Sequence, residues 1–298
     1  MTEILKVDNL HKSFGKHEVI KGISFSLNQG EICGFIGPNG AGKSTTFKLL
    51  ASLLIPDFGT IVINGFNLHS QREKALSNLS CSIEAPGLYT ELSGYDNLSL
   101  IGKLRNCKKE DIIKAADFTG IGAALKRKVG SYSMGMKQRL ILAMCILPKP
   151  KLLLLDEPTN GLDPTGVLEF RETLKQIVIQ QNTTVLISSH ILGELDKVCN
   201  RFLFIKDGKL VNDAYRSKDI SYRYRLATNN NLLALSLLLQ LPETELVSQV
   251  GNELEITFNT DEALTKALSL LVSEKLLIKN ITAITNSSEE EYRSIFYG

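Results

Sequence analysis

A glycine-rich segment, GPNGAGKST at residues 37–45, has the residue types needed to bind a triphosphate. It matches G-x-x-x-x-G-K-[ST], the phosphate-binding loop. Successive backbone N–H groups and the positive end of the following helix can neutralise phosphate charge with few side chains. We therefore predict that Lys43 contacts the β- and γ-phosphates of a nucleoside triphosphate and that the Ser44 hydroxyl contacts Mg²⁺. The expected nucleotide-binding residues are Gly37, Pro38, Asn39, Gly40, Ala41, Gly42, Lys43, Ser44 and Thr45.

Two adjacent acids, Asp156 and Glu157, follow an apolar run in KLLLLDEP, residues 151–158. Four successive leucines are typical of a buried strand in a parallel sheet. Asp156 is predicted to hold Mg²⁺ through water, and Glu157 to orient the attacking water and accept its proton. The alternative interpretation is that Asp156 and Glu157 are two acids at a solvated strand end and have no catalytic role. The phosphate-binding loop in the same chain favours catalysis.

The surrounding segments predict the elements that position these residues. Further apolar strands are expected in EICGFIG before the loop and in TTVLISSH near residue 190, and GKSTTFKLLASLL (42–54) has helical spacing. Residues 3–30 are predicted to form short strands, and residues 86–148 to be mostly helical. We expect an α/β P-loop NTPase core of the RecA-like type, with an antiparallel β part and a helical insertion.

The composition changes near Ser217, which predicts a second domain. From Tyr222 onward the pattern indicates strand, helix, two strands, helix and strand, an order that suggests a ferredoxin-like α+β unit. We therefore predict a nucleotide-binding domain over 1–216, with a helical subdomain at about 86–150, and an accessory domain over 217–298.

The overall composition argues against several function classes. The formal net charge is +2, which gives no strong electrostatic case for binding nucleic acid. The five cysteines are odd in number and lack C-x-x-C spacing, which favours reduced thiols over disulfides or a zinc site. The longest apolar runs are shorter than the roughly 20 residues of a membrane span. We expect a chain that neither carries a signal peptide nor crosses a membrane by itself.

The order of the motifs resembles the ATP-binding cassette family, the motor subunits of ABC transporters. The resemblance covers residues 3 to about 212. It implies that Phe14 stacks on the adenine ring, that His190 contacts the γ-phosphate, and that Asp163 lies at a subunit boundary. The motifs, in order, are Phe14 in LHKSFG, the phosphate-binding loop, Glu84 in SIEAPGLY, SYSMGMKQR, LLLLDEPTNGLD, and His190 in ISSH.

The segment YSMGMKQ is this chain's form of the family signature that is often written LSGGQ. In the family, two cassettes pack head to tail, and the signature of one reaches the γ-phosphate bound by the other. The resemblance thus implies that Ser133, Met134, Gly135 and Met136 act on the partner's ATP. Met134 stands where a glycine is usual, and Met136 also departs from the family pattern.

Glu84 occupies a position that usually holds a glutamine Mg²⁺ ligand in this family. A glutamate would add negative charge beside the metal and the γ-phosphate. Similar glutamate-bearing loops resemble those of bacitracin and lantibiotic-immunity exporters. The resemblance therefore implies that Glu84 contacts Mg²⁺; the alternative is a tolerated substitution.

Taken together, these features predict an ATPase subunit that dimerises and drives export through separate transmembrane permease subunits. Such a protein would sit at the cytoplasmic face of the membrane, bound through those subunits, and export of an antimicrobial peptide or similar compound is the expected task. In the family, residues 86–130 receive the membrane subunits. One alternative is a soluble cassette ATPase acting on ribosomes or DNA. Another is a nucleotide-sensing regulator without turnover, which the presence of Lys43, Asp156, Glu157 and His190 disfavours.

Overall fold

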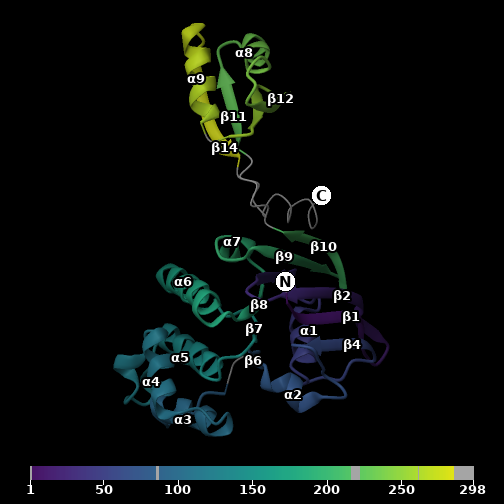
Figure 1. The fold of residues 1–298 in the computed structure, drawn as a ribbon, viewed down its shortest axis with the longest axis vertical. Coiled ribbons are helices and arrows are strands. Elements are labelled where there is room, and N and C mark those ends of the chain that lie inside the picture. Colours follow the sequence, from purple (N-terminus) through teal and green to yellow (C-terminus); the bar gives the residue numbers. More distant parts are fainter. Residues whose placement is uncertain (1, 85–86, 216–221, 261, 285–298) are drawn as a thin grey trace. The chain divides into compact units, whose positions relative to one another are not determined.

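The computed structural model describes residues 2–84, 87–215, 222–260 and 262–284. They form two compact units, one within residues 1–216 and the other within 217–294, and each is described by itself (Figure 1). Within these described residues, no helix combines the length and the apolar character that a membrane span requires.

An antiparallel sheet with the order β2-β1-β4-β5 begins the first unit. The long strands β1 and β2 form a hairpin in which Phe14 pairs with His17. β4 and β5 are joined at Asn64 and Gly65, which both have positive φ (48° and 80°), as a tight hairpin turn requires. The strands are β1 (Glu3–Phe14), β2 (His17–Asn28), β4 (Phe58–Ile63) and β5 (Phe66–Asn67).

A second sheet, with the order β10-β9-β3-β8-β7-β6, contains the predicted buried strands. Its strands from β9 to β6 run parallel, and β10 pairs antiparallel with β9 at one edge. Every residue of β7 and β8 is buried. The loops after β3, β7 and β8 share one edge because carboxyl ends of parallel strands meet there. The strands are β3 (Ile32–Ile36), β6 (Leu79–Ser82), β7 (Leu152–Leu155), β8 (Thr184–Ser189), β9 (Arg201–Lys206) and β10 (Lys209–Tyr215).

The helix after the phosphate-binding loop is shorter than predicted. α1 spans Lys43–Leu50 and not 42–54. Ser52 has a positive φ of 56°, and the N–H groups of Leu53 and Leu54 both donate to the Lys48 carbonyl. This left-handed turn satisfies the last carbonyls and ends the helix. The other helices of this region are α2 (Arg72–Ser77), α6 (Pro164–Gln181) and α7 (Leu192–Leu195).

The segment between β6 and β7 is helical, as expected, and forms a body beside the sheet (Figure 1). It contains α3 (Gly94–Leu104), α4 (Lys109–Phe118) and α5 (Met134–Ile146), with short 3-10 turns at Gly122–Ala124 and Val129–Ser131. Each of the three α-helices packs on the other two. Their arrangement sets the direction of α5, whose first turn carries Met134.

The second unit has the predicted ferredoxin-like topology. Its sheet has the order β12-β13-β11-β14 with only antiparallel neighbours. Two helices pack on one face around a small core that includes Leu226, Phe258 and Leu271. The elements are β11 (Tyr222–Thr228), α8 (Asn231–Leu238), β12 (Thr244–Val250), β13 (Glu253–Phe258), α9 (Ala263–Ser273) and β14 (Ile278–Ile284).

Candidate nucleotide-binding site

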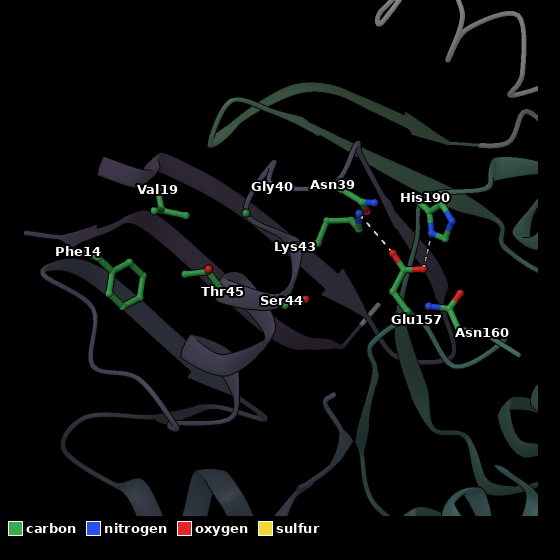
Figure 2. Close-up of a pocket in the computed structure, with 11 residues that line it drawn as sticks. Phe14, Val19, Asn39, Gly40, Lys43, Ser44, Thr45, Glu157, Asn160 and His190 are labelled. Carbon is green, nitrogen blue, oxygen red and sulfur yellow. Dashed lines mark hydrogen bonds and ion pairs between the residues drawn. The ribbon is translucent and has the colours of Figure 1, made fainter. Parts of the chain in front are cut away.

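A cavity of about 520 Å³ lies against the phosphate-binding loop, at the edge where β3, β7 and β8 end. Figure 2 shows the loop residues on one side and an acid–histidine pair on the other. The cavity thus joins the two segments that the sequence singled out for chemistry. Its lining residues are Phe14, Val19, Asn39, Gly40, Gly42, Lys43, Ser44, Thr45, Glu157, Asn160 and His190.

Two positions in the loop accept only glycine. A Cβ on Gly37 would lie 2.3 Å from the Ile205 carbonyl oxygen, which is backbone and cannot move aside. Gly42 has a φ of 110°, and a Cβ there would lie 2.6 Å from Cδ1 of Ile20. These contacts press the loop against the sheet, so its backbone is fixed in shape before any phosphate arrives.

Lys43 is buried, with its ammonium inside the loop. Its Nζ donates to the carbonyls of Gly37 at 2.7 Å and Pro38 at 3.3 Å. It also lies 3.3 Å from Oε1 of Glu157. A buried cation needs such partners, and they hold the charge at the wall of the cavity where phosphate oxygens would contact it.

Glu157 and His190 form a hydrogen-bonded pair across the ends of β7 and β8 (Figure 2). Nδ1 of His190 donates to Oε2 of Glu157 at 2.7 Å. Glu157 therefore uses one carboxylate oxygen for His190 and the other for Lys43. Its backbone has a positive φ of 48°, a conformation that is uncommon for a non-glycine residue and is concentrated at functional sites.

Ser188 connects the two acids, and the sequence analysis missed it. Its hydroxyl donates to Oδ1 of Asp156 at 2.6 Å and accepts from the Glu157 N–H at 2.8 Å. Ser188 and Asp156 are both buried. The only sequence signal was a polar residue inside the apolar strand that precedes His190, and that signal alone does not specify a partner.

We predict that Ser188→Ala lowers the kcat of ATP hydrolysis by about tenfold or more. The reason is that a buried hydrogen bond to a charged group contributes about 1.5–3 kcal/mol, and Ser188 also positions the Glu157 backbone. Steady-state phosphate release measures kcat. The matched control is Ser189→Ala, because among the described residues that buried hydroxyl bonds the Ile191 backbone alone. An equal loss in both variants, or none in Ser188→Ala, would contradict the assignment.

Phe14 reaches the far end of the cavity from the tip of the β1–β2 hairpin and is half exposed, which leaves a ring face open for stacking. The ammonium of Lys12 lies 5.7 Å from the centroid of this ring. Lys12 in turn donates to Asp57, and this hydrogen bond lowers the pKa of the Asp57 carboxyl. Val19 also lines the cavity. The residues around Val19 in the sequence gave no indication that it would lie at the nucleotide site.

The predicted signature residues lie around a second cavity, of about 830 Å³, and do not line the first. Ser133 caps α5, since its Oγ accepts from the Met136 N–H at 3.3 Å. Asp163 caps α6 in the same way, through the Gly166 N–H at 2.9 Å. The structure thus brings Ser133, Met134, Gly135, Met136 and Asp163 together beside two helix N-termini.

Comparison with known proteins shows which family this chain belongs to. A family model described as ABC transporter matches residues 20–160. The uncharacterized ABC transporter ATP-binding protein YhcH of Bacillus subtilis (strain 168) is 33% identical over 298 residues, covering 98% of this chain and 95% of that protein. The chain belongs to the ABC transporter ATP-binding proteins. The family hydrolyses ATP in transport, so this chain is an ABC ATPase and its cassette binds ATP.

Other relatives of this ABC ATPase have more specific names. The bacitracin transport ATP-binding protein BcrA of Bacillus licheniformis is 35% identical over 241 residues, which cover 79% of each chain. The lantibiotic transport ATP-binding protein SrtF of Streptococcus pyogenes is 37% identical over 230 residues, covering 77% of this chain and 98% of that protein. These matches confirm the resemblance to bacitracin and lantibiotic transport cassettes.

Solved ABC cassettes confirm the predicted fold class. The structure of cbiO1 from Clostridium perfringens, part of the ABC transporter complex cbiONQ, superposes with a TM-score of 0.67 at 26% identity. That match covers 81% of this chain and 97% of the other. A second ATP-binding subunit of an ABC transporter superposes with a TM-score of 0.64 at 28% identity, over 71% of this chain and 90% of that one.

The three predicted metal ligands of this ABC ATPase have different surroundings. Ser44 lines the first cavity, whereas Asp156 is buried and accepts a hydrogen bond from Ser188. Glu84 is exposed and pairs with Lys48 of α1 at 2.5 Å. Among the described residues, no three or more His, Cys, Asp or Glu side chains cluster as a metal site. This donor set suits Mg²⁺, which usually binds one or two carboxylates together with substrate phosphates and water.

Proposed function

We propose that this ABC ATPase is the motor subunit of an exporter, in which two copies pack head to tail around two ATP molecules. The separation of the two cavities carries this proposal. One cavity has the phosphate-binding loop, Glu157 and His190; the other has the signature and Asp163. Each cavity supplies half of an ATP site. In a head-to-tail pair, the loop cavity of each chain faces the signature cavity of the other, which gives two complete sites.

In the complete site, each residue has a role that follows from its contacts. Lys43 and the loop N–H groups bind the phosphates, and Phe14 stacks on the adenine ring. Glu157 accepts the proton of the attacking water, and His190 orients the Glu157 carboxylate through its Nδ1 hydrogen bond. Ser133 and Gly135 of the second copy approach the γ-phosphate, where the N-terminus of α5 favours negative charge.

Ser44 and Asp156 are the residues that would hold Mg²⁺, which bridges phosphate oxygens and neutralises their charge. Glu84 remains a predicted ligand. Because its carboxylate pairs with Lys48, it would have to leave that ion pair to approach the metal. Glu84 has a left-handed backbone, with a φ of 58°, and lies two residues after the end of β6.

The transported compound is proposed from the relatives. BcrA and SrtF are named for transport of bacitracin and of a lantibiotic, so we propose an antimicrobial peptide or a similar compound as the cargo. The chain would bind permease subunits through its helical region at the cytoplasmic face of the membrane. Exposed Tyr89 and Leu92, at the start of that region, offer apolar contact area.

Cross-linking between two differently labelled chains tests the head-to-tail arrangement. Asn39→Cys marks the phosphate-binding loop, and Met134→Cys marks the signature. The two variants also carry Glu157→Gln, which blocks turnover, and lack the accessible Cys81 and the partly exposed Cys107. When they are mixed with a short bis-maleimide, we expect a hetero-dimer only when ATP is present.

The control replaces Met134→Cys with Leu104→Cys, which is exposed on α3 and lies outside both cavities. It is expected to give no ATP-dependent product. Equal linking by Met134→Cys and Leu104→Cys, or no linking by either with ATP, would contradict the head-to-tail site. Recovery of hydrophobic permease subunits with the tagged chain from native membranes tests the transport assignment separately.

A further inference from the structure

The C-terminal unit has an open sheet edge at β12. In the described part of the chain, β12 pairs only with β13, because it is the outermost strand of the order β12-β13-β11-β14. A free edge presents backbone N–H and C=O groups, and proteins usually protect it with lysine, proline or a bulge. The stretch Leu246–Val250 has no lysine or proline, and the pairing irregularity lies before it, between Thr244 and Leu246. At the opposite edge, β14 carries the exposed Lys279.

Exposed apolar side chains occur on both faces of the sheet near this edge, although the β13 residues opposite Leu246 and Val250 are polar, namely Thr257 and Glu253. On the face without helices, Leu246 and Val250 are 61% and 50% exposed. On the other face, α8 is the helix that packs on β12, and in Figure 1 the two lie side by side. α8 and the residue that follows it expose three leucines, namely Leu232, Leu233 and Leu239. Exposed apolar groups on both faces of an unprotected edge indicate an interaction surface.

The sequence of this strand is complementary to itself. When a two-fold axis relates two edge strands, they pair antiparallel and one residue faces its own copy. Ser248 is the centre of the regular stretch 246–250. With Ser248 on the axis, Leu246 of each copy faces Val250 of the other on the open face. Glu245, the charged residue of β12, lies in the irregular part of the strand before Leu246, so the regular pairing of residues 246–250 brings no like charges opposite each other.

We propose that β12 pairs with β12 of a second copy of this chain, so that two four-stranded sheets become one continuous sheet. The choice of a second copy rests on the dimeric cassette proposed above, which tethers two such units in one assembly and thereby raises their effective concentration. No residue of the nucleotide cavities takes part in this contact. The strand pairing therefore holds two chains together with or without ATP.

A cysteine on the proposed axis tests the contact in the full chain. Two Ser248→Cys side chains would face each other at the separation of a cross-strand pair, and a mild thiol oxidant would join them as a disulfide. We expect a disulfide-linked dimer both with and without ATP. Lys279→Cys on the β14 edge is the matched control and is expected to stay monomeric on denaturing gels, as is the chain with its native cysteines.

Ser248→Lys supplies a second measurement, because it places two ammonium groups opposite each other at an exposed position. Like charges placed opposite each other across an interface cost binding free energy, so we expect the dimer dissociation constant without nucleotide to rise at least about tenfold, while ATP binding stays unchanged. Asn280→Lys on β14 is the control and should leave the constant unchanged. No change in Ser248→Lys would overturn the proposal.

The test separates this inference from the proposed function. If Glu157→Gln dimerises with ATP but Ser248→Cys links no more than Lys279→Cys, the strand pairing is wrong and the head-to-tail cassette stands. If Ser248→Cys forms a linked dimer but the loop and signature cysteines never do, the strand pairing stands and the head-to-tail cassette is wrong. A link from Ser248→Cys to a different polypeptide would also overturn the proposal, because another strand would then occupy the edge.

Discussion

Replacing Glu157 by glutamine is expected to lower ATP turnover by about 100-fold or more while ATP still binds. The substitution keeps the size of the side chain and removes the carboxylate that accepts the proton of water; a positioned general base typically contributes about 10²–10⁴-fold. Lys43 keeps its two loop carbonyls in this variant, so the phosphate-binding loop should remain formed. Phosphate release measures turnover, and size-exclusion chromatography with ATP should show a stable dimer.

Glu73→Gln provides the matched control for this variant. Glu73 is exposed on α2 and lines neither cavity, so the same chemical change there should leave turnover within about twofold, because exposed charges contribute little. If Glu157→Gln retained turnover within tenfold of the unchanged chain, Glu157 would not be the base. His190 would then be the next residue to test, since it lines the same cavity.

Replacing Lys43 by methionine is expected to weaken ATP binding by about 100-fold. The ammonium is the buried cation of the loop, and charged hydrogen bonds contribute about 1.5–3 kcal/mol each. The variant also leaves Oε1 of Glu157 without the cation that lies 3.3 Å away. Titration with a fluorescent ATP analogue measures the dissociation constant, and a thermal melt checks that the variant is folded.

Lys48→Met is the control for Lys43→Met, because both lysines lie on α1 and only Lys43 lines the cavity. Lys48 pairs with Glu84 instead. The binding constant of Lys48→Met should therefore stay within about threefold of the unchanged chain, as expected for a partly exposed ion pair. Equal weakening in the two variants would show that α1 as a whole, and not the Lys43 charge, determines binding.

The sequence predicted those parts of the site that depend on local chemistry. The loop around Lys43 has fixed spacing, and the apolar run before Asp156 has one compatible structure, a buried strand. The ferredoxin-like order was also predictable, because each amphipathic helix such as α9 has to cover a sheet face. The end of α1 was not predictable, since the apolar Leu53 and Leu54 continue the helical spacing beyond the turn at Ser52.

Contacts between distant residues were the part that sequence reasoning could not reach. Ser188 and Asp156 lie 32 positions apart, and their hydrogen bond depends on the register between two parallel strands. Val19 lines the cavity only because the β1–β2 hairpin folds over the loop. The ion pair between Glu84 and Lys48 was also not predictable. No sequence pattern indicates that the end of β6 lies beside α1.

The hydrogen bond between the Asp156 N–H and the Ser82 carbonyl, at 2.8 Å, has a consequence for inhibitor discovery. Ser82 is the last residue of β6, from which the chain leaves for the helical region, and Asp156 begins the loop that carries Glu157. A nanobody that tilted the helical region would pull on this strand end. It could thereby silence the enzyme from outside, without competing against the high ATP concentration of a living cell.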